Sequence, residues 1–374
     1  MKKARVSVIQ MDIKLGELRS NLDKALKLTE KALNKDSDLI ILPEMWPTGF
    51  DYQALESYEP SYYKDILSLI ANLADKGKAY IVAGSMAEIE DGNFYNTSFA
   101  VDPFGKILGG YRKVHLFKEL KEDKFFTPGD KAFAVDTKVG KLGIAVCYDL
   151  RFPEIFRTEA LAGAEIICVP AEFPKPRLEH WLTLLQARAI ENQCFIVGAN
   201  RVGKTGKIEY FGNSVIFGPY GECLGEAGKK EEVLTADIDL DTVSETRERL
   251  PSLRERRPEA YRSIGEIEIK PLKIEPPKEE EKEEDEAKVE VKEKGEREET
   301  PKPSKKTKEE PAKKKPEPEK IEKKSLPKNF EAEQPVEELE EVKVKHKKKS
   351  HSSEDLLKTK LSLKEAGQPM KSRQ

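Results

Sequence analysis

The sequence predicts an α/β fold, a four-layer α-β-β-α sandwich of two mixed sheets, followed by a disordered, highly charged tail. Three observations support this prediction. Short runs rich in β-branched residues alternate with helical patterns through the first part of the chain, as in folds that place helices over a sheet. Two Pro/Gly turns, at residues 101–106 and 218–221, each indicate a hairpin. After about Tyr261 the apolar periodicity gives way to Lys/Glu/Pro runs.

The first half of the pattern predicts a βαβαβ series and then an antiparallel hairpin. A β-branched or apolar run marks each strand, and a longer helical pattern lies between successive strands. The strands are expected at 6–10, 39–42 and 80–84, and the helices at 21–33 and 62–76. Residues 94–113 then form two strand-like stretches around the turn at 101–106, so we expect a sheet with both parallel and antiparallel pairs.

The second half repeats this organisation. Strands are expected at 142–148, 165–170 and 195–200, helices at about 153–162 and 179–192, and closing strands at 211–217, 222–225 and 232–239. Two halves that each end in a hairpin predict two sheets stacked face to face, with the helices outside.

The charged C-terminal part of the chain is not expected to form a core. Residues 271–374 hold 28 basic and 27 acidic side chains and a single aromatic residue, Phe330. Burial of so little apolar surface does not offset the conformational entropy lost on folding. We therefore predict one domain, residues 1–265, and a disordered tail, 266–374. The basic run at 345–349 leaves contact with a polyanion open, although a solvated tail is the simpler interpretation.

Composition also limits the partners and the location. The first 270 residues are mildly acidic, which argues against nucleic-acid binding, since that requires clustered basic side chains. No apolar run approaches the roughly 20 residues that span a bilayer, and the N-terminus lacks the pattern of a signal peptide. We expect a cytoplasmic protein that does not bind membranes.

The cysteines and histidines do not predict a metal site. Cys147, Cys168, Cys194 and Cys223 are far apart in sequence, with no Cys-x-x-Cys pair. Outside the tail there are only two histidines, at positions 115 and 180. A catalytic base is therefore expected among the carboxylates.

Cys147 is the strongest candidate nucleophile. An apolar strand leads directly into it, and Pro153 marks the start of the following helix. A sharp strand-to-helix turn exposes a side chain and leaves nearby backbone N–H groups free to stabilise an oxyanion. The turn alone leaves open the alternative that Cys147 is a small core residue.

Two other strand ends supply the groups that a cysteine nucleophile needs. Glu44 follows the apolar run at 39–42, where partial desolvation raises a carboxyl pKa towards a range useful for proton transfer. Lys113 follows a strand-like stretch and could lower the pKa of a thiol or stabilise an oxyanion. An ordinary loop carboxylate and a solvated lysine are the alternatives. His115 is interpreted as structural.

Residues 42–44, 111–116 and 146–154 together resemble the three catalytic signatures of the nitrilase superfamily, the carbon–nitrogen hydrolases, in order and spacing. The resemblance extends from residue 1 to about residue 261. It implies an α-β-β-α sandwich and a Glu-Lys-Cys triad, with no metal and no organic cofactor. Family members generally pair, so a homodimer is expected.

The resemblance also implies roles for individual residues. Glu44 would take the proton of Cys147 and later protonate the departing ammonia, while Lys113 and the Tyr148 N–H would hold the oxyanion. Water would then release the acid from a thioester. Glu122, in the loop before Pro128-Gly129, fits the second glutamate of many members, and Glu119 is the alternative.

Within this family, residues 42–50 and 172–181 look most like those of ω-amidases. Such enzymes hydrolyse the side-chain amide of 2-oxoglutaramate or 2-oxosuccinamate, and water is the second reactant. Arg177 could bind the distal carboxylate of this substrate in a bidentate manner. Trp46, Phe50 and Phe173 could form an apolar wall of the site, or could be core residues.

Other functions remain open at this point. The same triad could hydrolyse an N-carbamoyl amide, a nitrile or deaminated glutathione. In a different class, the domain could be an inactive scaffold that displays the charged tail.

Overall fold

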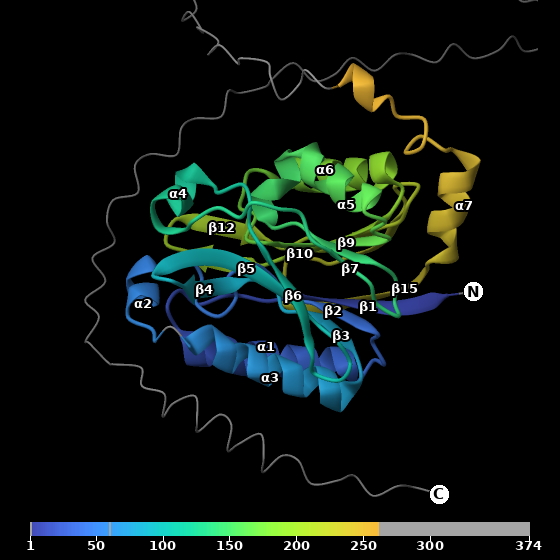
Figure 1. The fold of residues 1–374 in the computed structure, drawn as a ribbon. Helices are drawn as coiled ribbons and strands as arrows, with labels where there is room; N and C mark the ends of the chain where they lie inside the picture. The colour runs from blue at the N-terminus through green and yellow to red at the C-terminus, as the bar shows by residue number, and fades with distance from the viewer. Residues whose placement is uncertain (1, 60, 262–374) are drawn as a thin grey trace, which may run out of the picture. The chain divides into compact units, whose positions relative to one another are not determined.

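The computed structural model describes residues 2–59 and 61–261. The predicted boundary after residue 265 and the predicted disordered tail, 266–374, lie outside the described residues. Up to residue 258, the chain forms two stacked sheets with helices on both outer faces (Figure 1). This arrangement confirms the predicted four-layer sandwich of mixed sheets.

The first sheet has the strand order β15-β1-β2-β3-β5-β4, and β6 also pairs with β5. Its central strands β1, β2 and β3 are parallel, while the pairs β1–β15 and β3–β5 are antiparallel. In chain order the strands are β1 (Lys3–Gln10), β2 (Leu39–Ile41), β3 (Tyr80–Val82), β4 (Met86–Glu90), β5 (Asn93–Val101), β6 (Ile107–Arg112) and β15 (Glu232–Asp239).

The second sheet has the strand order β14-β13-β10-β9-β8-β7. Its parallel centre is formed by β8, β9 and β10, and a separate ribbon is formed by β11 and β12. The strands are β7 (Ala134–Val135), β8 (Leu142–Ile144), β9 (Ile166–Ala171), β10 (Phe195–Asn200), β11 (Val202–Thr205), β12 (Ile208–Phe211), β13 (Val215–Phe217) and β14 (Cys223–Glu226).

The helices cover the outer faces of both sheets (Figure 1). α1 (Leu18–Leu33) and α3 (Tyr62–Gly77) pack on the first sheet, and α5 (Pro153–Leu161) and α6 (Leu178–Asn192) on the second. The shorter elements are α2 (Tyr52–Glu56), α4 (Glu122–Phe125), α7 (Asp241–Arg249) and the 3₁₀ turns η1 (Lys118–Leu120), η2 (Cys147–Arg151) and η3 (Pro258–Ala260).

Burial on two faces explains why the central strands read as continuous apolar runs. Along β1, Val6 and Val8 belong to the core shared with the second sheet. Ile9 instead belongs to the core shared with α1 and α3. Successive side chains of a strand point to opposite faces, so both faces of β1 need apolar residues.

The sequence pattern grouped the last strand with the second half of the chain, but the structure does not place it there. β15 returns to the first sheet and pairs antiparallel with the whole of β1, from Lys3 opposite Asp239 to Gln10 opposite Glu232. The first sheet therefore contains both the first and the last strand of the described chain.

Two predicted strands are shorter than expected because left-handed residues interrupt them. The predicted strand at 211–217 is broken after β12, where Gly212 and Asn213 have φ of +75° and +49°. The predicted strand at 142–148 ends at Ile144, and Cys147 has φ of +48°. A left-handed backbone cannot continue a β-ladder, so each site forms a turn.

Within the part of the chain that the structure describes, no helix is both long enough and apolar enough to cross a bilayer.

Candidate active site

The structure brings Glu44, Lys113 and Cys147 together from three strand ends. Glu44 follows β2, Lys113 follows β6, and Cys147 opens η2 just after β8. The Lys113 Nζ lies 2.8 Å from Glu44 Oε1. Glu44 and Lys113 have no exposed surface, whereas Cys147 retains 8% of its surface. Cys147 is therefore the least buried of the three residues.

Glu122 completes the charged cluster. Its Oε1 accepts a second 2.8 Å hydrogen bond from Lys113 Nζ. Burial raises the pKa of Glu122 to about 7, although the charge of Lys113 acts in the opposite direction. Its other oxygen, Oε2, is buried and has no hydrogen-bond partner among the described residues. Glu119, the alternative to Glu122, forms its ion pair with Arg177 instead.

Lys113 is charged in this environment. Burial alone would lower the pKa of its ammonium group, but the charges of Glu122 and Glu44 hold this pKa well above its ordinary value. Two carboxyl groups therefore share one buried ammonium, an arrangement whose stability depends on close pairing.

The thiol of Cys147 is protonated at rest. Burial raises its pKa well above the ordinary value, and the charge of Glu44 and a hydrogen bond to Glu44 raise it further, while Lys113 lowers it. The thiol needs a base before it can attack, and the carboxylate of Glu44 lies close enough to shift the pKa of this thiol. The positive φ of Cys147 is a backbone strain of the kind that concentrates at functional sites.

Two contacts that the sequence did not predict fix the carboxylate of Glu44. Asn96 Nδ2 donates to Glu44 Oε1 at 2.9 Å, and the backbone N–H of Glu172 donates to Glu44 Oε2 at 2.9 Å. Asn96 is buried within β5. Asn96 could have been recognised from the sequence as a polar residue within a strand that is covered on both faces.

Glu172 and Arg201 form a second buried ion pair beside this cluster. Arg201 Nη1 donates to Glu172 Oε2 at 2.8 Å, and both side chains are about 1% exposed. Burial raises the pKa of Glu172 to about 7, and Arg201 counteracts this shift. Each residue directly follows an apolar strand, β9 or β10, which is the same signal that marked Glu44.

Asp149 holds the turn that carries the nucleophile. Its carboxylate accepts from the backbone N–H of Val146 at 2.8 Å and of His115 at 3.0 Å, and from the Tyr111 hydroxyl at 2.8 Å. The His115 ring also contacts Asp149, Nδ1 to Oδ1, at 2.8 Å. It stacks on Phe152 with centroids 3.6 Å apart. His115 thus lies within the packing of this turn.

The aromatic residues expected at the substrate wall lie in different surroundings. Trp46 is fully buried, and its indole N–H donates to the Ala83 carbonyl at 2.8 Å. Phe50 packs edge-on against Phe126 at 6.4 Å. Phe173 is 3% exposed and lies 5.2 Å from the ring of Trp181.

Arg177 and Tyr148 share a neighbour, Phe117. The Phe117 ring lies 4.8 Å from the ring of Tyr148 and 5.5 Å from the guanidinium of Arg177. Arg177 Nη2 pairs with Glu119 Oε2 at 2.8 Å. Tyr148 is the second residue of η2, where the first N–H groups of a helical turn have no partner within the turn.

No group of three or more His, Cys, Asp or Glu residues with the geometry of a metal site occurs within residues 2–59 and 61–261. The four cysteines, all in this part of the chain, are free thiols.

The family model for carbon-nitrogen hydrolases matches residues 5–248. The chain belongs to this family. As a carbon–nitrogen hydrolase, it is an enzyme that acts on amides. It is 37% identical over 259 residues to the 2-oxoglutaramate amidase of Bacillus subtilis, an alignment that covers 69% of this chain and 100% of that protein. It is 32% identical over 272 residues to omega-amidase NIT2-B of Xenopus laevis, with 70% and 98% covered.

Solved structures agree with this assignment. The carbon–nitrogen hydrolase of Helicobacter pylori G27 superposes with a TM-score of 0.67 at 30% identity, covering 71% of this chain and 100% of that one. The amidase of Nesterenkonia sp. AN1 superposes with a TM-score of 0.63 at 26% identity, covering 70% and 99%. One of its structures shows acrylamide added to its active-site cysteine.

Proposed function

We propose that this carbon–nitrogen hydrolase cleaves the amide of a small ω-amide such as 2-oxoglutaramate through a Cys147 thioester. The observation that carries the proposal is the buried cluster in which Lys113 lies 2.8 Å from both Glu44 and Glu122. The Nesterenkonia amidase, with its active-site cysteine, supports Cys147 as the nucleophile.

In the first half of the reaction, Glu44 removes the proton of Cys147 and the sulfur attacks the amide carbon. The carbonyl oxygen becomes an oxyanion, which Lys113 and the Tyr148 N–H stabilise. Glu44 then returns the proton to the nitrogen, the C–N bond breaks, and ammonia leaves. The free Oε2 of Glu122 is an acceptor for an N–H of the substrate amide.

In the second half, Glu44 takes a proton from water, and the resulting hydroxide attacks the thioester carbon. The same donors hold the second oxyanion. The C–S bond breaks, the sulfur recovers its proton from Glu44, and the carboxylic acid is released. The asymmetric anchoring of Glu44, by Lys113, Asn96 and the Glu172 N–H, supports its use as the base in both halves.

The substrate class is inferred from Arg177 and from the relatives. Arg177 lies two ring contacts from the nucleophile turn, and its fork of donors suits a carboxylate distant from the scissile amide. Two relatives are named for 2-oxoglutaramate and ω-amides. Phe50 and Phe173 remain proposals for the apolar wall, and Trp46 would act behind them, since it is fully buried.

Ammonia release from 2-oxoglutaramate, 2-oxosuccinamate, glutamine and N-carbamoyl-β-alanine tests this function. We expect the two 2-oxo amides to have the highest kcat/KM, and Cys147→Ala to abolish turnover while still folding. A higher kcat/KM for N-carbamoyl-β-alanine would assign a different substrate to the same triad. No turnover of any amide, with a Cys147 that resists iodoacetamide, would favour the scaffold function.

We also propose a homodimer and a cytoplasmic location. Leu161 and Ile190, on α5 and α6, are large apolar side chains that are about half exposed, and burial against a second copy would remove them from water. Light scattering of the purified full chain tests the dimer.

A further inference from the structure

The ion pair between Arg177 and Glu119 joins two segments near the nucleophile turn, since Phe117 contacts both Arg177 and Tyr148. Arg177 lies directly before α6 and Glu119 lies in η1. Their Nη2 and Oε2 atoms are 2.8 Å apart. The Arg177 side chain is 13% exposed, whereas that of Glu119 is 51% exposed. The pair therefore joins a largely buried cation to a half-solvated anion.

This asymmetry makes Glu119 the replaceable partner. Because Glu119 is half-exposed, water solvates its charge when the pair opens, so Glu119 is released at little cost. Arg177 is largely removed from water, so its positive charge must be balanced by a nearby anion. A carboxylate of another molecule that approached along Phe117 would satisfy Arg177 equally well.

The same short segment also reaches the catalytic cluster. Glu119 and Glu122 are three residues apart, and Glu122 binds Lys113. The backbone N–H of Glu122 donates to the Phe117 carbonyl at 3.3 Å, which closes this segment into a compact turn. Residues 117–122 thus place one glutamate on Lys113 and the other on Arg177.

We propose that Glu119 is a specificity-determining residue, which occupies Arg177 in the free enzyme and is displaced by the distal carboxylate of the substrate. The proposal rests on the proposed function, in which Arg177 binds that carboxylate. A neutral amide leaves the Glu119–Arg177 pair intact, whereas a carboxylate-bearing amide must compete with Glu119. Glu119 therefore weakens binding of the charged substrate only.

The test compares binding of 2-oxoglutaramate and of pentanamide, a neutral amide of the same chain length. Dissociation constants are measured by calorimetry in the full chain with Cys147→Ala, which prevents turnover. Glu119→Gln should tighten 2-oxoglutaramate binding about two- to fivefold, the range of one exposed ion pair. It should leave the dissociation constant of pentanamide unchanged. Arg177→Gln should weaken 2-oxoglutaramate binding only.

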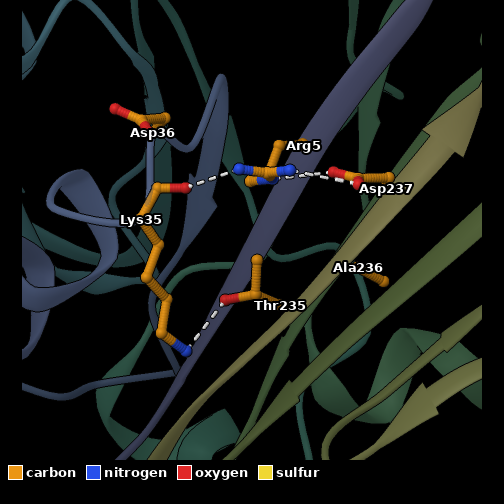
Figure 2. A pocket seen from close by; sticks show the side chains of 6 residues that line it. All are labelled: Arg5, Lys35, Asp36, Thr235, Ala236 and Asp237. Carbon is orange, nitrogen blue, oxygen red and sulfur yellow. Dashed lines mark hydrogen bonds and ion pairs between the residues drawn. The ribbon is translucent and has the colours of Figure 1, made fainter.

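Asp237→Asn is the matched control, because it removes the same charge from another exposed ion pair. Asp237 contacts Arg5 at 2.7 and 3.1 Å (Figure 2). Arg5 is near the start of β1, so this pair lies at the end of the parallel strands opposite to the one that Glu44 follows. Asp237→Asn should change neither dissociation constant.

Two results would overturn the inference in distinguishable ways. If Glu119→Gln weakens 2-oxoglutaramate binding or leaves it unchanged, while Arg177→Gln weakens it, then Glu119 does not compete with the substrate and the proposed function stands. If Arg177→Gln has no effect on 2-oxoglutaramate, the carboxylate-binding role of Arg177 fails, and the role of Glu119 fails with it.

Discussion

Replacing Glu122 by glutamine tests the charge balance around Lys113. The amide keeps the size of the side chain and an oxygen that can accept from Lys113 Nζ, but it cannot ionise. In the wild-type enzyme, the buried carboxyl has a pKa of about 7, against an ordinary value of 4.5. The substitution therefore removes one ionisable group whose proton affinity differs between the folded and unfolded chain.

The sign and size of the effect follow from this shift. A carboxyl with a raised pKa in the folded state contributes stability that is complete below pH 4.5 and is lost as the pH rises through 7. Between pH 5 and pH 8, this one group should lower the free energy of unfolding by about 2–3 kcal/mol, using about 1.4 kcal/mol for each pKa unit. Glu122→Gln should abolish that part of the pH dependence.

Urea unfolding of the wild type and the variant at pH 5 and pH 8 measures this difference. Glu172, whose pKa is also raised to about 7, titrates in both proteins and cancels in the comparison. Glu245→Gln, on the exposed face of α7, is the matched control and should keep the wild-type pH dependence.

One result would refute this reasoning. If Glu122→Gln loses as much stability between pH 5 and pH 8 as the wild type, then Glu122 is not the group that ionises in this range. Glu122 would then keep one charge state in the folded enzyme across this range.

The remaining predictions concern the nucleophile turn, the buried ammonium and the tail. Asp149→Asn places an amide N–H opposite groups that now donate hydrogen bonds to Asp149. The free energy of unfolding in urea should fall by about 2–4 kcal/mol, and kcat should fall about 10²-fold because Cys147 is displaced. An unchanged kcat would contradict this. Lys113→Met leaves Glu44 and Glu122 without their ammonium and should lower the free energy of unfolding by about 3–5 kcal/mol. Measured by the same urea assay, the loss should be larger at pH 8 than at pH 5. An equal loss at the two pH values would contradict this prediction. Truncation after residue 265 should leave kcat/KM and the melting temperature unchanged; a lower kcat/KM would give the tail a part in catalysis.

The sequence predicted the residues of the cluster better than their surroundings. Glu44 and Cys147 follow β2 and β8, and the ends of apolar strands can be recognised from a short stretch of sequence. Their convergence does not follow from the order of strands in one sheet, because β2 belongs to the first sheet and β8 to the second; the resemblance to the carbon–nitrogen hydrolases implied it. The role of Glu172 could not be predicted in this way, because it contacts Glu44 through its backbone N–H, which every residue except proline carries.

The position of β15 was missed for a different physical reason. Most of its residues are only partly buried, as they would be at the edge of either sheet. The choice between the sheets depends on a pairing of 8 residues with β1, over 220 positions earlier in the chain. No local pattern encodes a partner at that distance, whereas the hairpin of β5 and β6 is specified by its own turn.

The buried charges around Cys147 explain why proton transfer to Glu44 is central to the proposed mechanism. A thiolate formed by losing a proton to water would add a negative charge to a cluster in which two carboxyls already share Lys113, and burial makes such a charge costly. Transfer of the proton to Glu44 creates the thiolate while neutralising the carboxylate, so the total charge beside Lys113 is unchanged. When the sulfur attacks, the negative charge moves to the substrate oxygen, which Lys113 can reach once Glu44 is neutral. The high pKa of the resting thiol is therefore compatible with catalysis, because the base that raises this pKa is also the group that accepts the proton.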